Sequence, residues 1–131
     1  MKVPPPVAEL LGIDLVQGGG GKCTMKIEVE ERHSNPMGTI HGGIIGDLAD
    51  AAMGMAYFST LAEGESFTTL ELKINFLRPF WTGTLLAHGR VVHGGRMVGL
   101  TECDVVDDSG RLIARASSTC MTLRGDAARG R

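Results

Sequence analysis

A glycine-rich junction, residues 35–43, is the local sequence best suited to chemistry. It reads NPMGTIHGG, and its last two glycines stand where an apolar segment begins. If a helix starts at Gly42, its first backbone N–H groups have no partner inside the helix, and the helix dipole adds positive potential. Such a helix start can hold an anion or stabilise negative charge that develops on a carbonyl oxygen. The alternative is a plain loop whose glycines serve only backbone geometry.

Asp50 is the second candidate, because it lies inside the apolar segment, eight residues after Gly42. An ionised aspartate in such a segment is costly unless it is paired, hydrogen-bonded or placed in a wet cleft. Asp50 is therefore a candidate functional carboxylate. Asp47 lies on the same helix face. It is closer to the helix start and fits better the alternative of a solvated carboxylate on an exposed strip.

The spacing of these two candidates predicts a dimer. Eight helical residues span about 12 Å along the helix axis. Reacting groups must approach to about 3–3.5 Å, so one substrate carbonyl cannot touch both the Gly42 N–H and the Asp50 carboxylate of one helix. If both groups act together, they come from different subunits, as when two helices lie antiparallel. The segment is also apolar nearly all round, so a second surface must cover what one sheet leaves open.

The rest of the chain predicts strands on both sides of one long helix. The helix is expected from about residue 42 to residue 62, because that segment is rich in Ala, Met, Leu and Ile and is too long for a strand. Alternating apolar residues and turn signals predict a helical turn over 7–11 and strands over 13–17, 22–30, 67–77, 83–93, 97–106 and 111–123. The strands that flank Gly94 and Gly95 are expected to form a hairpin.

These elements predict an α+β fold, a single domain over residues 1–131 in which an antiparallel β-sheet wraps around one long central helix. Residues 1–11 and 124–131 are expected to be peripheral, the second segment as a frayed tail. Residues 32–40 are expected to form a polar loop. The histidines His33, His88 and His93 are expected at loop or strand surfaces.

Composition excludes several classes of protein. A chain of 131 residues fits one domain, and a net charge of −2 argues against nucleic-acid binding, where a basic stripe is expected. The three cysteines form neither a disulfide framework nor a CxxC metal motif, as is typical of buried thiols in a reducing cytosol. No signal peptide is visible, and two carboxylates in the apolar segment argue against a membrane helix. We expect a cytoplasmic protein without a metal site.

Four segments of the chain form a combination found in a known family: NPMGTIHGGIIGDLADAAMGMA, TTLELKINFLRPFWTG, GRVVHGGR and DDSGRLIARASST. Together they resemble the hotdog-fold thioesterases, and within them the phenylacetate-pathway (PaaI-like) acyl-CoA thioesterases. The resemblance covers roughly residues 12–123. It implies the hotdog fold, homodimers with a continuous sheet that often assemble to homotetramers, and hydrolysis of acyl-CoA thioesters at the dimer interface. No metal or cofactor is needed for that reaction.

Carried over by position, the resemblance implies five catalytic residues. Asp50 matches the catalytic carboxylate, which acts as a general base or as a nucleophile. Gly42 matches the residue whose backbone N–H polarises the thioester carbonyl. His41 matches the motif histidine that fixes the loop or the carbonyl environment. Asn35 matches a polar residue that positions the thioester or water, and Thr69 matches a hydroxyl residue that orients the water or the carboxylate.

The position of Thr69 conflicts with simple strand alternation. Thr69 shares its parity with Glu71 and Lys73, which we assign to the wetter face of the 67–77 strand. Either a β-bulge turns Thr69 toward the helix, or the wet face lines the interface cleft. An ordinary strand threonine is the third reading.

Four further residues match positions near the CoA nucleotide in relatives: Arg78, Gly95, Arg96 and Thr119. An arginine there would hold a phosphate through charge-assisted hydrogen bonds. The alternative for each arginine is a solvated surface side chain.

Two other functions stay open on the sequence. A hotdog dehydratase or hydratase would use His41 and Asp50 to exchange protons on a hydroxyacyl thioester. A non-catalytic acyl-CoA sensor would bind the same ligand without releasing free thiol, because a fold alone does not fix a function.

Overall fold

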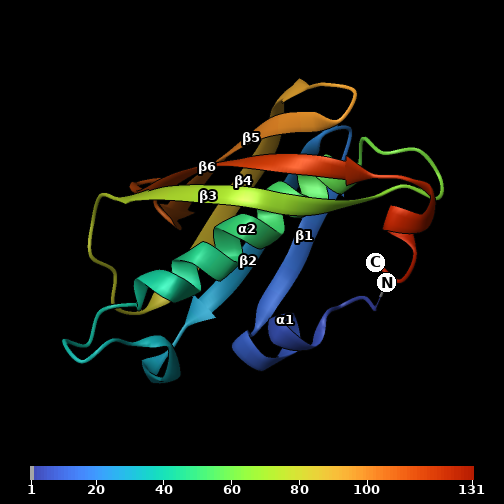
Figure 1. Ribbon diagram of the computed structural model, residues 1–131. Coiled ribbons are helices and arrows are strands. Elements are labelled where there is room, and N and C mark those ends of the chain that lie inside the picture. The colour runs from blue at the N-terminus through green and yellow to red at the C-terminus, as the bar shows by residue number, and fades with distance from the viewer. Residues whose placement is uncertain (1) are drawn as a thin grey trace.

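The long apolar segment forms helix α2 (Gly42–Phe58), and a curved antiparallel sheet wraps around it (Figure 1). The computed structural model describes residues 2–131. The six strands are β1 (Ile13–Gly19), β2 (Lys22–Val29), β3 (Ser66–Phe76), β4 (Gly83–Gly94), β5 (Val98–Asp107) and β6 (Leu112–Leu123). Their order in the sheet is β1-β2-β4-β5-β6-β3, and all neighbours are antiparallel. The predicted α+β fold, with its hairpin between β4 and β5, is confirmed.

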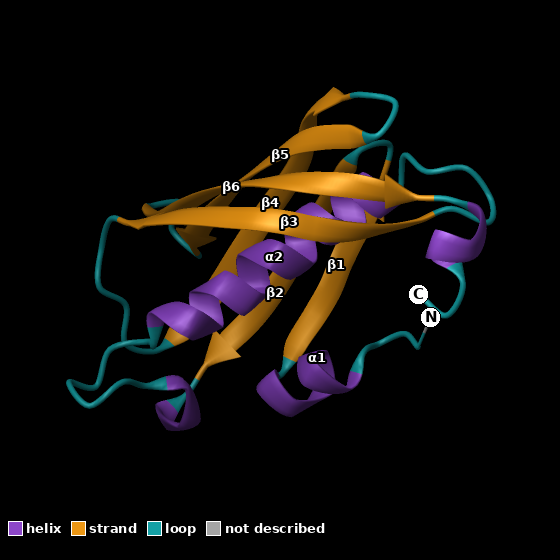
Figure 2. Ribbon diagram, viewed as in Figure 1, coloured by secondary structure: helices purple, strands orange, loops and turns teal. Residues whose placement is uncertain are grey.

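Three short helices lie outside this core, as Figure 2 shows by colour. They are α1 (Pro6–Leu11), η1 (Glu31–His33) and η2 (Gly125–Ala128). Among residues 2–131, no helix combines the length and the apolar character needed to cross a membrane. All three cysteines are free and buried.

Helix α2 ends four residues earlier than predicted. Its C-cap is Ser59, whose hydroxyl donates to the Ala56 carbonyl at 2.7 Å and accepts from the Gly21 N–H at 2.9 Å. The Thr60 hydroxyl likewise donates to the Tyr57 carbonyl at 2.7 Å. Hydroxyl side chains that take up the last carbonyls of a helix compete with its continuation. The composition of residues 59–62 hides this end, since the segment stays largely uncharged.

Strand β3 crosses α2 on a stripe of small residues that recurs at every fourth position of the helix. A Cβ atom on Gly42 would stand 2.9 Å from the Phe76 ring, and one on Gly54 would stand 3.0 Å from the Phe67 ring. Residues four apart lie on one helix face. The stripe therefore lets the large side chains of β3 approach the helix backbone closely; it consists of Gly42, Gly46, Asp50 and Gly54.

A β-bulge in β3 determines which face of the strand carries the Thr69 side chain. Thr69 lies opposite Cys120 on β6, but Glu71 lies opposite Thr119, the next residue along, so Leu70 is the extra residue. One extra residue reverses which side chains face the helix. Thr69 therefore points inward although Glu71 points outward. Of the two explanations for a functional Thr69, the structure has the bulge.

The N-terminal helix is anchored by a histidine that we expected at the surface. His33 is only 1% exposed. Its Nδ1 accepts from the Glu30 N–H at 3.0 Å, and its Nε2 lies 2.8 Å from the Leu11 carbonyl. The side chain thus satisfies one of the unpaired carbonyls at the end of α1. The surface prediction was wrong for His33, because a terminal carbonyl 22 residues away supplies a buried partner.

The C-terminal segment is also more ordered than a frayed tail. Residues Gly125–Ala128 form η2, and Arg124 just before it pairs with Glu65. The Arg124 guanidinium also donates to the Arg96 carbonyl at 2.7 Å. These contacts tie the segment to the β4–β5 turn. The expectation of fraying was therefore wrong for its first half, because a cation in the tail finds partners on the folded domain.

The contact between β4 and α2 gives a first prediction. A Cβ on Gly89 would stand 2.5 Å from the Ala52 carbonyl oxygen, which is backbone and cannot turn away. Gly89→Ala is expected to lower the free energy of unfolding by about 3 kcal/mol, as overpacking does. Gly94→Ala, on the same strand, is the matched control because a Cβ there meets nothing within 4 Å. Urea denaturation of both variants is the measurement, and equal midpoints would contradict this packing.

Candidate active site

The start of α2 leaves one backbone N–H free. His41 is the N-cap, and its Nδ1 accepts from the Gly43 N–H at 3.0 Å. Its carbonyl oxygen accepts from the N–H groups of Ile44 and Ile45, at 3.0 and 3.5 Å. Within residues 2–131, the Gly42 N–H has no such acceptor. His41 therefore satisfies the rest of the first turn and leaves the Gly42 donor available at the positive end of the helix dipole.

A groove of about 440 Å³ opens beside this donor. Its walls are largely apolar, and they bring together three predicted residues: Asn35, Gly42 and Arg78. The Asn35 side chain is held by its own loop, since Oδ1 accepts from the Met37 N–H at 2.9 Å and Nδ2 donates to the Thr39 hydroxyl at 2.8 Å. A side-chain amide carries two N–H groups. One donor of Asn35 is therefore committed to the loop, and the amide orientation is fixed.

Asp50 and Thr69 form a separate pair in the middle of the helix. The Thr69 hydroxyl donates to Asp50 Oδ1 at 3.1 Å. Burial raises the pKa of Asp50 above its ordinary value, the Thr69 hydrogen bond opposes that rise, and the charge of Asp47 adds to it. Asp47 itself is exposed, whereas Asp50 is half-buried. Asp50 is thus the carboxylate in the costly environment, and its raised pKa makes it a better base.

The five predicted catalytic residues therefore fall into two groups. Asn35, His41 and Gly42 lie at the helix start, while Asp50 and Thr69 lie two turns further on. The groove at the helix start is lined by neither Asp50 nor Thr69. The eight helical residues from Gly42 to Asp50 separate the groups by about 12 Å along the axis. One chain does not bring the free N–H and the carboxylate onto the same small substrate group.

The four predicted nucleotide contacts are also divided within one chain. Arg78 lines the groove at the start of α2. Gly95 and Arg96 lie in the β4–β5 turn at the other end of the helix, where Gly99 packs against Tyr57. The Thr119 hydroxyl donates to Glu71 at 3.0 Å on the face of the sheet away from α2. The two arginines, Arg78 and Arg96, thus lie near opposite ends of one α2 helix.

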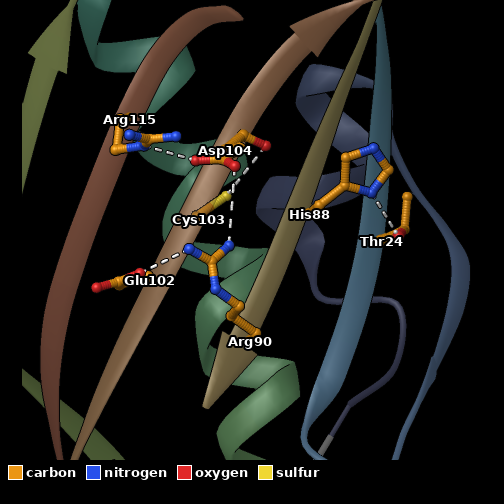
Figure 3. Close-up of polar contacts among 7 residues, drawn as sticks. All are labelled: Thr24, His88, Arg90, Glu102, Cys103, Asp104 and Arg115. Carbon is orange, nitrogen blue, oxygen red and sulfur yellow. Dashed lines mark hydrogen bonds and ion pairs between the residues drawn. The ribbon is translucent and has the colours of Figure 1, made fainter. Parts of the chain in front are cut away.

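A charged cluster on the outer face of the sheet was not predicted from the sequence (Figure 3). Arg90 pairs with Glu102 at 2.6 Å and Asp104 at 3.8 Å, and Arg115 pairs with Asp104 at 2.8 Å. Strand register places them opposite one another on β4, β5 and β6. The charge of Arg90 is therefore offset by carboxylates of its own sheet. Only the pairing of strands, which single segments do not reveal, signals this cluster.

A second depression, about 460 Å³, lies beside this cluster. It is lined by Lys22, His88 and Arg90 and by the glycines at the end of β1. His88 makes a hydrogen bond of 2.9 Å to Thr24 across the β2–β4 pair. The depression contains neither Asp50 nor Gly42. Among residues 2–131, no group of His, Cys, Asp and Glu side chains is arranged to hold a metal ion.

The raised pKa of Asp50 predicts a stability change. In the folded chain the ionised carboxylate is disfavoured, so Asp50 lowers the free energy of unfolding at pH values above its folded pKa. Asp50→Asn is therefore expected to be more stable than the parent at pH 7. This advantage should fade as the pH falls and Asp50 becomes protonated. Urea titrations across this pH range measure it, with the exposed Asp14→Asn as control; an Asp50→Asn variant no more stable than the parent at pH 7 would refute it.

Known proteins are similar to this chain in sequence and in fold. Residues 37–114 match the Thioesterase superfamily. Human acyl-coenzyme A thioesterase 13 is 30% identical over 109 residues, which are 82% of this chain and 77% of that protein. The Escherichia coli PaaI protein from the phenylacetic acid degradation operon superposes with a TM-score of 0.86 at 28% identity, over 93% of this chain and 87% of that one.

A third relative extends the comparison. The conserved protein PA5202 from Pseudomonas aeruginosa superposes with a TM-score of 0.87 at 31% identity, covering 91% of this chain and 94% of that one. These likenesses confirm the predicted hotdog fold and the resemblance to PaaI-like thioesterases. The chain therefore belongs to the thioesterase superfamily, and its enzyme class is that of the thioester hydrolases.

Proposed function

We propose that the protein hydrolyses acyl-CoA thioesters to a free acid and CoA at a site shared by two subunits. The observation that carries this proposal is the division of the candidate residues along α2. A free N–H at the helix start suits the stabilisation of negative charge on a thioester carbonyl oxygen. A half-buried carboxylate two turns away suits the activation of water or direct attack on the acyl carbon. Human acyl-coenzyme A thioesterase 13, a relative, is named for this substrate class.

The edge of the sheet supports a dimer. Strand β3 is eleven residues long and has a neighbour, β6, on one side only. Its Leu70 and Phe76 are 53% and 58% exposed, and Leu77 just beyond it is 52% exposed. A long, apolar, unpaired edge is a site for pairing with another strand. Two β3 strands related by a two-fold axis would continue the sheet and set the two α2 helices antiparallel.

In such a dimer the reaction follows from the chemistry of each group. The Gly42 N–H of one subunit stabilises the negative charge that develops on the thioester oxygen. Asp50 of the other subunit takes a proton from water, whose oxygen then bonds to the acyl carbon while the carbon–sulfur bond breaks. The proton ends on the CoA thiolate. In the alternative route the Asp50 carboxylate bonds to the acyl carbon as the carbon–sulfur bond breaks and CoA thiolate leaves, and water then hydrolyses the mixed anhydride to the free acid and Asp50.

The remaining predicted residues support these steps. His41 holds the helix start so that the Gly42 donor stays free, and Asn35 holds the loop that forms the groove wall. Thr69 orients the Asp50 carboxylate. Antiparallel helices would also bring Arg78 of one subunit near the end of the other that carries Gly95 and Arg96, where the CoA phosphates would bind. Thr119, the assembly to a homotetramer and the cytoplasmic location stay predictions.

Loss of the carboxylate gives the direct test. Asp50→Asn is expected to lower kcat/KM by about 10³-fold, which is within the usual contribution of a general base. Asp47→Asn is the matched control, because its exposed carboxylate lies one turn away, and it should retain activity within a few-fold. Free thiol release from aryl and aliphatic acyl-CoAs measures both variants and identifies the preferred acyl group.

Three outcomes of this assay would contradict the proposal. Acyl-CoA binding without thiol release from any substrate would favour the sensor. Loss or gain of a carbon–carbon double bond in the acyl chain, without thiol release, would favour the dehydratase. Full activity of Asp50→Asn would leave a thioesterase but remove Asp50 from the mechanism.

A mixed dimer tests whether the site is shared. Gly42→Pro removes the N–H at the first helical position, which tolerates proline, and His41 before it already has the extended backbone that a proline requires (φ −67°, ψ 132°). Gly42→Ala is the control that keeps the N–H while adding the same Cβ, 2.9 Å from the far end of the Phe76 ring.

Each single variant should be nearly inactive, but equal co-expression of Gly42→Pro and Asp50→Asn chains should restore activity. Half of the dimers are then mixed and each holds one intact site, so about a quarter of the parent activity is expected. Activity no higher than that of the two variants purified separately would place both groups of each site in one chain.

A further inference from the structure

A string of buried hydroxyl and thiol groups lies behind Asp50 and Thr69. On β6, Cys120 is the register partner of Thr69, and Ser118 follows on the same inner face. Ser118 in turn lies opposite Thr101 on β5, and the two hydroxyls share a short hydrogen bond. Thr101, Ser118 and Cys120 are each 0% exposed. The reaction scheme above uses none of the three.

The number of protons on each group determines the direction of the hydrogen bonds along this string. An ionised carboxylate only accepts hydrogen bonds, so the single proton of the Thr69 hydroxyl is committed to Asp50. The Thr69 oxygen can then only accept, and the side chain directly across from it is the Cys120 thiol. The Cys120 sulfur lies 3.9 Å from the Ser118 hydroxyl, within reach of a hydrogen bond to sulfur. Every group therefore finds a partner if Ser118 donates to Cys120 and Cys120 donates to Thr69, with the Thr101 proton shared between the hydroxyl and the backbone carbonyl of Ser118, the latter at 3.2 Å.

The thiol is in the right protonation state to donate. Burial raises the pKa of Cys120 above its ordinary value, the hydroxyls of Ser118, Thr69 and Thr101 oppose that rise, and the charge of Asp50 adds to it. Cys120 thus keeps its S–H proton at neutral pH. Among residues 2–131, the charge of Asp47 on the same helix and the Thr69 hydroxyl on β3 act on the pKa of Asp50, and the charge of Asp50 acts in turn on the Cys120 thiol on β6.

We propose that Cys120, supported by Ser118 and Thr101, is a positioning residue that fixes the Thr69 hydroxyl as a donor to Asp50. The proposal rests on the function proposed for Asp50. Hydrogen bonds in a chain strengthen one another when all point the same way. The string therefore holds Asp50 ionised in a half-buried place, and it keeps Thr69 from rotating its proton elsewhere.

The pH dependence of kcat/KM tests the role of the thiol. Cys120→Ala removes the donor behind Thr69, so the acid limb of the profile, which reports Asp50 ionisation, should move to higher pH. At neutral pH, kcat/KM should fall about 5-fold, the effect of one ordinary hydrogen bond. Cys120→Ser keeps a donor and should restore the parent profile. Cys103→Ala, an equally buried thiol on β5, is the matched control and should change nothing.

Two results would overturn the proposal. If Cys120→Ala and Cys120→Ser shift the profile equally, the site needs only the volume of the thiol. If Cys120→Ala keeps the parent profile, the string does not reach Asp50. Ser118→Ala, one step further along, provides a second variant with the same readout if Cys120→Ala does not fold, and it should move the acid limb in the same direction; an unchanged limb there counts against the string.

A spectroscopic measurement separates this proposal from the proposed function. In a Cys23→Ala, Cys103→Ala background, Cys120 is the one remaining thiol, so its S–H stretching band in the infrared is isolated. The band should shift as Asp50 titrates, and it should move in Thr69→Val, whether or not the protein hydrolyses a thioester. A band unaffected by Thr69→Val refutes the string. Full hydrolysis by Asp50→Asn, together with a band that shifts with Asp50 titration and in Thr69→Val when Asp50 is present, refutes only the catalytic role of Asp50.

Discussion

The close contact between β3 and α2 governs the rest of the structure. Glycines at three of four positions spaced four residues apart leave the helix bare on the side that β3 crosses, and large side chains of the strand, two of them aromatic, occupy that space. The fourth member of the stripe is Asp50, which has a side chain where the others have none. A carboxylate at that position needs a polar partner on the strand. The β-bulge supplies it, because it turns Thr69 toward the helix at the one place where a hydroxyl is required.

This arrangement explains why the candidate residues are divided. The helix that buries its glycines against β3 also carries the free N–H and the carboxylate on neighbouring parts of its surface. A rigid helix fixes their separation, so no loop movement can bring them together within a chain. A two-fold axis along the β3 edge is the simplest operation that can. The same exposed edge that would threaten a monomer with aggregation thus serves, in the proposed dimer, to complete the site.

The sequence predicted most of the fold because its signals are local. Alternation in residues 22–30 and the Gly94-Gly95 turn each involve neighbours along the chain, and the structure confirms both elements. Asp50 stood out because a charge in an apolar helix has a cost that a reader of the sequence can estimate. The misjudged features depend on distant partners: His33 is buried by a helix end, and Arg124 is held by Glu65. The Cys120 string and the ion pairs around Asp104 depend on strand register, which no single segment encodes.

Leu70 has an unusual place in this scheme. Its side chain is exposed and contributes little to the core of its own chain, yet it is the residue that makes the bulge. Many side chains can stand at an exposed strand position, so its identity is weakly constrained. The presence of a residue at position 70 is strongly constrained, because its deletion would return β3 to regular alternation. Either Thr69 or the aromatic end of the strand would then face the opposite side of the sheet. Insertions and deletions in this strand are therefore expected to disturb the fold much more than substitutions at the same position.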